Sequence, residues 1–138
     1  MKLRLLSPDD VYAGWDWLRN GIIHCQRKTD ARYRPEDIYL RLRASTAWAY
    51  AIEHNGDDIG FAVLTQEFDP DGLVLFVWVI WCEPGGAIGV HRDIFAELET
   101  MARSIKAKRI RMHSPRKGWE KARYFTPVTI VYEHEVML

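Results

Sequence analysis

A glycine-rich segment at positions 83–89, EPGGAIG, contains the residue types that most directly suggest chemistry. It follows the apolar run Leu73 to Cys82 and precedes a long amphipathic stretch that predicts a helix. A helix N-terminus presents unpaired backbone N–H groups and a partial positive charge, and glycines allow a phosphate to approach them closely. The segment lacks the lysine of a P-loop and the GxGxxG pattern of dinucleotide sites. It therefore predicts either a phosphate-binding turn or a plain flexible connection.

Two side chains near this segment are candidates for proton transfer. Glu83 stands directly after the apolar run, and His113 ends the alternating run 108–113, which predicts a neighbouring strand. An imidazole titrates near neutral pH and suits a general base. A structural interpretation is open for both: an exposed turn residue for Glu83, and a strand-end histidine with a satisfied hydrogen bond for His113. Cys82 ends the apolar run and is expected to be a small buried hydrophobe.

The charges are unevenly distributed along the chain. The 19 Lys and Arg balance the 19 Asp and Glu, so a generic polyanion or nucleic-acid binder is disfavoured. Positions 44–91 contain no Lys or Arg, whereas positions 103–123 contain nine of them and only one acid, Glu120. This pattern predicts either a solvated surface of uneven charge or a site that takes a cation on one side and phosphates on the other.

The elements that must position these residues alternate between strands and helices. A strand is expected over 2–6, a helix from Ser7 to about Ile22 that Gly21 would end or bend, and a second helix opening at Pro35. Strands are expected over 47–52, 59–68 and 73–82, the last of them central and covered on both faces. A helix over 92–106, a strand over 108–113, a short helix within 114–125 and one or two strands over 127–137 complete the order.

Length and composition indicate one domain. The chain has 138 residues, of which 48% are hydrophobic, so disorder is excluded and a second core would not fit. No apolar run is long enough to span a bilayer, the N-terminus does not resemble a signal peptide, and the two cysteines lack metal spacing. We expect a cytoplasmic α+β protein: a mixed sheet with helices on both faces, spanning residues 1–138 as a single three-layer α-β-α domain.

The element order, the length and the position of the glycine-rich loop resemble the GNAT superfamily of N-acetyltransferases over essentially the whole chain. In that family the fourth strand ends in a loop of pattern Q/R-x-x-G-x-G/A, whose backbone amides bind the pyrophosphate of acetyl-CoA. The pattern aligns with positions 84–89, where Pro84 and Ala87 replace the usual residues and Gly89 matches. The resemblance implies the acyl-CoA N-acyltransferase fold.

The resemblance also implies site residues. Residues of the loop would bind acetyl-CoA, and residues of the preceding strand would lie along its pantetheine arm between the splayed fourth and fifth strands. Tyr124 is the candidate, by position, for the tyrosine that protonates the departing thiolate, beside Glu83 and His113 as candidate bases. The basic stretch 106–123 would meet the 3′-phosphate, and the acidic block would suit a cationic amine. The implied cofactor-binding residues are Ile80, Trp81, Cys82, Gly85, Gly86, Ala87 and Gly89.

Two functions follow as hypotheses. The first is transfer of an acetyl group from acetyl-CoA to a small-molecule or peptide amine by direct attack. The second is a catalytically inactive GNAT-fold protein that binds a protein partner or a second copy as an assembly module. The segment 21–45 loosely resembles small GNAT-like proteins of phages and prophages. Six tryptophans in a short chain fit the second hypothesis, since aromatic residues anchor protein contacts. An interaction with nucleic acid or a membrane is not expected.

Overall fold

The fold is described from a computed structural model covering residues 1–27, 33–85, 90–113 and 134–137. Up to the fifth strand the elements follow the predicted order, except that the first predicted helix is two helices. The predicted last helix and most of the final strands lie outside the described residues, and residues 134–137, where the prediction of a final strand can be checked, are not in a strand. The elements are β1 (Lys2–Leu5), α1 (Pro8–Ala13), α2 (Trp15–Gln26), α3 (Pro35–Arg43), β2 (Trp48–His54), β3 (Asp57–Asp69), β4 (Gly72–Cys82), α4 (Val90–Ser104) and β5 (Arg109–Met112).

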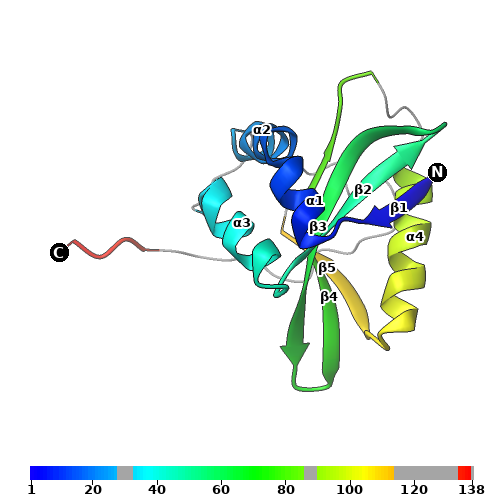
Figure 1. Cartoon of the computed structure of the whole chain (residues 1–138). Coiled ribbons are helices and arrows are strands. Elements are labelled where there is room, and N and C mark those ends of the chain that lie inside the picture. Colours follow the sequence, from blue (N-terminus) through cyan, green and yellow to red (C-terminus); the bar gives the residue numbers. More distant parts are fainter. Residues whose placement is uncertain (28–32, 86–89, 114–133, 138) are drawn as a thin grey trace.

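The strands form one mixed sheet in the order β1-β2-β3-β4-β5 (Figure 1). The first three pairings are antiparallel and the β4–β5 pairing is parallel, because α4 forms a crossover between these two strands. The predicted hairpin turn between β2 and β3 is confirmed: Asn55 and Gly56 both have positive φ, 52° and 82°, as a tight hairpin requires. Pro70 and Asp71 form the predicted turn between β3 and β4.

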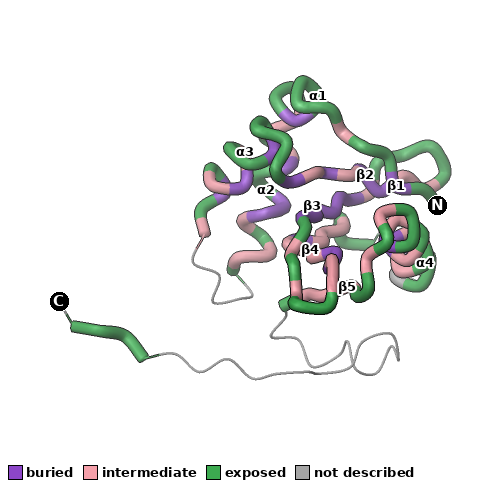
Figure 2. The backbone as a smooth tube through the Cα atoms, turned by 90° about the horizontal axis from the view of Figure 1, so that it is seen from below, coloured by how far each residue is buried: buried purple, intermediate pink, exposed green. Residues whose placement is uncertain are grey.

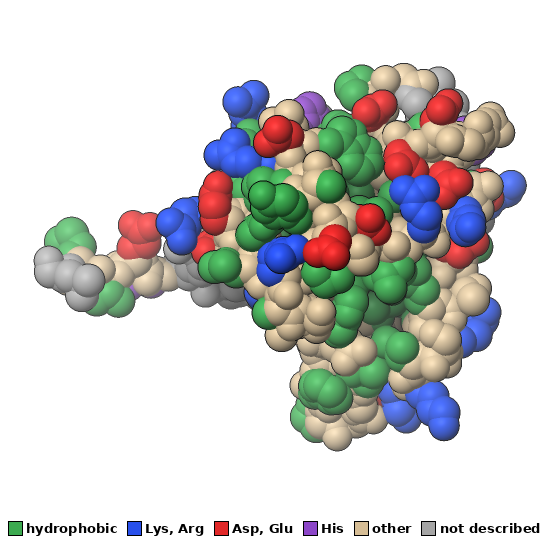
Figure 3. Space-filling model, viewed as in Figure 1, with side chains coloured by type: hydrophobic (Ala, Val, Ile, Leu, Met, Phe, Trp, Pro, Cys, Tyr) green, Lys and Arg blue, Asp and Glu red, His purple; other side chains and the backbone are tan. Residues whose placement is uncertain are grey.

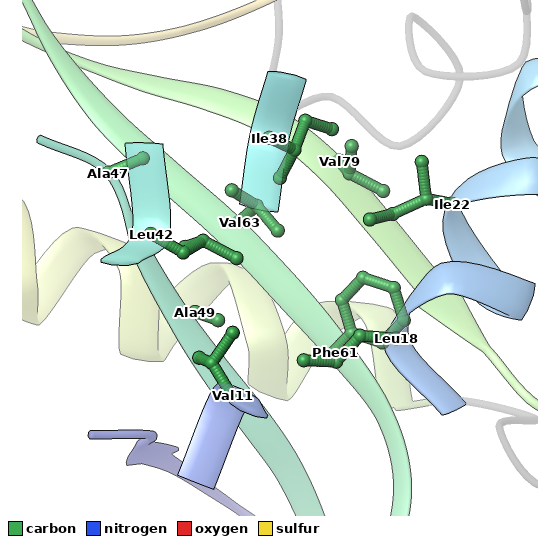
Figure 4. Close-up of a cluster of buried hydrophobic side chains, with 10 residues drawn as sticks. All are labelled: Val11, Leu18, Ile22, Ile38, Leu42, Ala47, Ala49, Phe61, Val63 and Val79. Carbon is green, nitrogen blue, oxygen red and sulfur yellow. The ribbon is translucent and has the colours of Figure 1, made fainter. Parts of the chain in front are cut away.

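Helices cover both faces of the sheet and bury one apolar cluster on each (Figures 1 and 2). The cluster on the α4 face contains Ile94 and Leu98 of that helix. The opposite cluster lies beneath α1, α2 and α3, and Figure 4 shows Ile22 and Ile38 pointing toward the sheet within it. The predicted three-layer α-β-α architecture is therefore confirmed. Among the described residues, no helix is long and apolar enough to cross a membrane.

The N-terminal helical region is two helices rather than the single helix predicted. The predicted start is confirmed, because the Ser7 Oγ accepts from the Asp10 N–H and the Asp10 carboxylate accepts from the Ser7 N–H, both at 3.0 Å. The break falls at Gly14, which ends α1 and precedes α2. Gly21, where the sequence suggested an end or bend, lies inside α2.

The central strand β4 contains a bulge. Leu64 of β3 pairs with Val77 and Val63 pairs with Val79, so Trp78 is the extra residue on β4. The prediction that β4 is covered on both faces is confirmed for Val74, Leu75, Val77 and Val79, which are buried. From position 80 to 82 the side chains are only partly buried, since the strand there extends beyond its last pair with β5.

Candidate active site

The C-terminal half of β4 has an open edge in the described chain. Pairing with β5 ends at Val77 opposite Met112, so within the described residues 79–82 pair with β3 alone and the bulged Trp78 has no strand partner. The Glu83 N–H donates to the Ile59 carbonyl on β3 at 2.7 Å. Because backbone groups alternate in direction along a strand, those of Ile80 and Cys82 point away from β3, toward this open edge. The open edge, residues 78–82, leads directly to the predicted cofactor loop.

The side chains of Ile80, Trp81 and Cys82 do not share one surface. Ile80 and Cys82 pack against the cluster on the α4 face, and Trp81 packs on the opposite face beneath α2. The Trp81 ring lies 5.8 Å from that of Trp17 and 5.7 Å from that of Phe61. Trp81 therefore fills the core under α2. The groups that β4 presents to the open edge come from its backbone more than from the side chains of Ile80, Trp81 and Cys82.

The Cys82 thiol is confirmed as a partly buried apolar group. Burial raises its pKa above the ordinary value, so it stays protonated at neutral pH and is a poor nucleophile. The loop that follows begins with exposed residues, and Gly85 has a φ of +81° with open space where a Cβ would stand. A glycine is favoured there because an L side chain rarely adopts this positive φ.

The two candidate bases, Glu83 and His113, lie at different positions along the length of β4. Glu83 is exposed and accepts a hydrogen bond from the Trp17 indole at 3.2 Å. His113 is also exposed, and its ring packs edge-on against Phe76 with the centroids 5.0 Å apart. Phe76 and Glu83 are seven residues apart on one chain segment, about 23 Å at the strand rise per residue. The structure therefore does not bring Glu83 and His113 together.

Two residues beside the open edge were not predicted as site residues. The Cys25 Sγ–H, near the end of α2, donates to the Ile80 carbonyl at 3.4 Å. Tyr33 packs edge-on against Trp78 with ring centroids 5.5 Å apart, and burial, then the neighbouring Cys25, raises the pKa of its hydroxyl. Tyr33 thus remains protonated at neutral pH. No sequence pattern links these positions, because the contacts depend on where α2 ends against β4.

Two arginines of the basic block pair with three carboxylates of the acidic block across the sheet. Arg111 on β5 pairs with Asp69 at 2.6 Å and with Glu67 at 3.2 Å. Arg109 pairs with Asp71 on both guanidinium nitrogens and with Asp69 at 3.3 Å. The expectation that this acidic block is available for a cationic amine is therefore wrong for these carboxylates. The same pairing removes Arg109 and Arg111 from the cations that could meet a phosphate.

Four predicted site residues, Gly86, Ala87, Gly89 and Tyr124, lie outside the described residues. Within the described ranges, no group of three or more His, Cys, Asp or Glu residues has the arrangement of a metal site. The open edge of β4, the start of the loop and the residues around Trp78 are thus the described parts of the candidate site.

Comparisons with known proteins relate the whole chain to acetyltransferases. No family model and no curated protein matches the sequence. A probable acetyltransferase of known structure superposes with a TM-score of 0.71 at 17% identity, covering 100% of this chain and 98% of the other. A ribosomal-protein-alanine N-acetyltransferase from Brucella melitensis biovar Abortus 2308 gives 0.68 at 14% identity, with 100% of both chains covered.

A third similar structure is an aminoglycoside acetyltransferase from an uncultured soil metagenomic sample, solved in complex with sisomicin. Its TM-score is 0.69 at 8% identity, with 99% of this chain and 95% of the other covered. Identities this low establish the fold and leave substrate and activity open. Together with the mixed sheet, its bulged fourth strand and its helices on both faces, these similarities show that the chain has the GNAT acetyltransferase fold.

Proposed function

We propose that this protein transfers the acetyl group of acetyl-CoA to an amine by direct attack. The observation that carries the proposal is the open edge of β4. There a strand stops pairing with its neighbour at a bulge and leads to a glycine-rich loop before a helix. Several structures that it resembles along the full chain are described as acetyltransferases, and one of them was solved with an aminoglycoside, a small-molecule amine.

The residues present fit acetyl-CoA. The N–H of Ile80 and the backbone groups of Cys82 at the open edge are suited to pair with the amides of a pantetheine arm, as an added strand would, whereas the Ile80 carbonyl already accepts from the Cys25 thiol. Gly85, Gly86, Ala87 and Gly89 would hold the pyrophosphate through backbone N–H groups before α4. Acetyl-CoA bound there supplies the acetyl thioester.

The protein's own groups would move the protons. His113 is proposed as the base that takes a proton from the ammonium, because it lies against Phe76, two residues from the bulge at Trp78. Glu83 sits near the loop instead, and we propose for it a supporting role there through its bond to Trp17. Tyr124 is proposed to return a proton to the departing thiolate sulfur. Direct attack within a ternary complex needs no covalent enzyme intermediate, which agrees with a protonated Cys82.

Calorimetry with acetyl-CoA, followed by a thiol-release assay on a panel of amines, tests this function. We expect micromolar binding that Gly89→Glu abolishes, because a carboxylate in the loop repels the pyrophosphate. Gln66→Glu adds the same charge on an exposed position of β3 and should bind normally. His113→Gln should bind acetyl-CoA normally but lower kcat by roughly 10²- to 10⁴-fold, while His24→Gln on α2 should not. Absence of binding at millimolar acetyl-CoA would exclude the enzyme hypothesis and favour the inactive, partner-binding alternative.

A further inference from the structure

The guanidinium of Arg41 on α3 is held rigidly by uncharged groups. Its Nε donates to the Thr46 Oγ1 at 3.3 Å, and its Nη2 donates to the Thr46 carbonyl and the Thr65 Oγ1, each at 3.0 Å. Thr65 is 5% exposed and is fixed in turn by donating to the Thr46 carbonyl at 3.1 Å. These bonds use the Nε hydrogen and both Nη2 hydrogens. The two hydrogens on Nη1 have no acceptor among the described residues.

The charge of Arg41 is uncompensated within the described part of the chain. No carboxylate there lies within ion-pair distance of it, whereas Arg109 and Arg111 on the same face are paired with acids. Arg43, two residues after Arg41 on α3, donates to the Pro8 carbonyl at 2.6 Å and approaches the Asp9 carboxylate at 3.8 Å. A fixed, exposed guanidinium with two free donors is a ready partner for an anion.

Arg41 is also connected to the open edge of β4 by direct contacts. Its guanidinium carbon lies 5.0 Å from the centre of the Trp78 ring, and Trp78 is the bulged residue where β4 leaves β5. On another side of the same ring stands Tyr33, next to the Cys25 thiol that caps the Ile80 carbonyl. This cation, which has no carboxylate partner in the described part of the chain, therefore lies one aromatic ring away from the place where the proposed transfer occurs. On the face seen in Figure 3, basic and acidic side chains are interspersed.

We propose that the acceptor is an amine that also carries a carboxylate, such as a free amino acid, and that Nη1 of Arg41 binds this carboxylate. The inference rests on the proposed function, since it names the class of acceptor for that site. It selects against polycationic amines such as aminoglycosides, because Arg41 repels a second ammonium and Glu67, Asp69 and Asp71 are already neutralised.

Matched pairs of acceptors test the proposal: β-alanine and γ-aminobutyrate against their primary amides, which differ only in the carboxylate. With the wild type, we expect higher kcat/KM for the acids. Arg41→Met should lower kcat/KM for the acids by roughly 10- to 100-fold, the effect of losing a charge-assisted hydrogen bond, and leave the amides unchanged. Arg41→Lys should recover part of the loss. Arg43→Met is the matched control, because Arg43 lies over the Tyr12 ring at 5.7 Å, away from Trp78, and should change neither class.

A second readout does not depend on activity. The indole N–H resonance of Trp78, assigned with a Trp78→Phe variant, is followed during titration with N-acetyl-β-alanine and with its amide. We expect a shift with the acid only, and its Kd should weaken at least about tenfold in Arg41→Met. If acids and amides react and bind alike, or if Arg41→Met weakens both alike, the inference is wrong while acetyl transfer stands. If acetyl-CoA does not bind and no amine reacts, the proposed function is wrong, and the titration alone decides whether Arg41 binds a carboxylate.

Discussion

Gly21 is where a single missing Cβ allows α2 to pack against the sheet. A Cβ built there would lie 2.4 Å from a ring carbon of Phe61 and 2.9 Å from a ring carbon of Trp81. The Phe61 ring is fully buried and cannot yield space. The close approach also seats Trp81 under α2, which keeps its ring out of the proposed cofactor path.

Gly21→Ala should therefore destabilise the protein despite a better helix propensity. Alanine gains about 1 kcal/mol in a helix interior, but overpacking a rigid core costs typically about 1–3 kcal/mol. We expect a net loss of up to about 2 kcal/mol, measured by urea unfolding. Asn20→Ala, at an exposed position of the same helix, should be neutral or slightly stabilising. Equal effects of the two substitutions would show that the contact is not tight.

For single residues, the sequence predicts features that depend on local conformation and does not predict contacts with residues far away in the chain. The hairpin at Asn55-Gly56 was predictable because two positive φ angles are a local requirement of the turn. The role of Gly21 was not, because the clash partners are 40 and 60 residues away in sequence. Arg41 gave no signal for the same reason: its partners Thr65 and Trp78 come from β3 and β4.

At the scale of elements, β5 is attached to the β3–β4 hairpin by an arginine–carboxylate ladder. Arg109 and Arg111 alternate with Ile110 and Met112, so one face of this short strand is ionic and the other packs against the α4 cluster. The sequence predicted the alternation and the charged blocks. It did not predict that the blocks pair, because that depends on the register in which Val74 meets Arg109.

The ladder makes the attachment of β5 sensitive to acid. Hydrogen bonds from Arg109 hold the pKa of Asp71 at about 2, below its ordinary value of 3.8. A carboxyl whose pKa is lower in the folded state stabilises the fold above its unfolded pKa, and this contribution is lost as the pH falls through the folded pKa. The contribution should be complete above about pH 5 and disappear toward pH 2.

An NMR titration of the Asp71 carboxyl carbon checks this directly. The midpoint should lie near 2 in the wild type and move up toward 3.8 in Arg109→Gln. Arg103→Gln, which removes an arginine paired with Glu99 on α4, should leave the Asp71 midpoint unchanged. Added salt should raise the wild-type midpoint, because exposed ion pairs are screened. A midpoint that stays at the wild-type value in Arg109→Gln would contradict the assigned cause.

At the scale of the whole molecule, the two apolar clusters are joined through the strands they share. Phe61 belongs to the cluster beneath α1, α2 and α3, and its chain neighbour Ala62 belongs to the cluster beneath α4. β4 does the same, and the bulge at Trp78 places Val77 and Val79, which are two residues apart, in opposite clusters. The layer order was predictable from the alternation of strands and helices; the bulge was not, because β4 is apolar at every position from 73 to 82.

Because the clusters share their strands, damage to either should destabilise the whole domain in one cooperative transition. Ile38 is fully buried on one face and Leu98 is 2% exposed on the other. Replacing either with alanine should cost about 2–5 kcal/mol, and tryptophan fluorescence and far-UV circular dichroism should report the same urea midpoint in each variant. Leu40→Ala, at a side chain that is 64% exposed, should change stability by less than about 0.5 kcal/mol. Most tryptophans lie on the α2 face, so fluorescence reports mainly on that face. If the fluorescence transition of Leu98→Ala has a higher urea midpoint than its circular dichroism transition, the two faces unfold separately. The sheet then does not couple the α4 side to the candidate site.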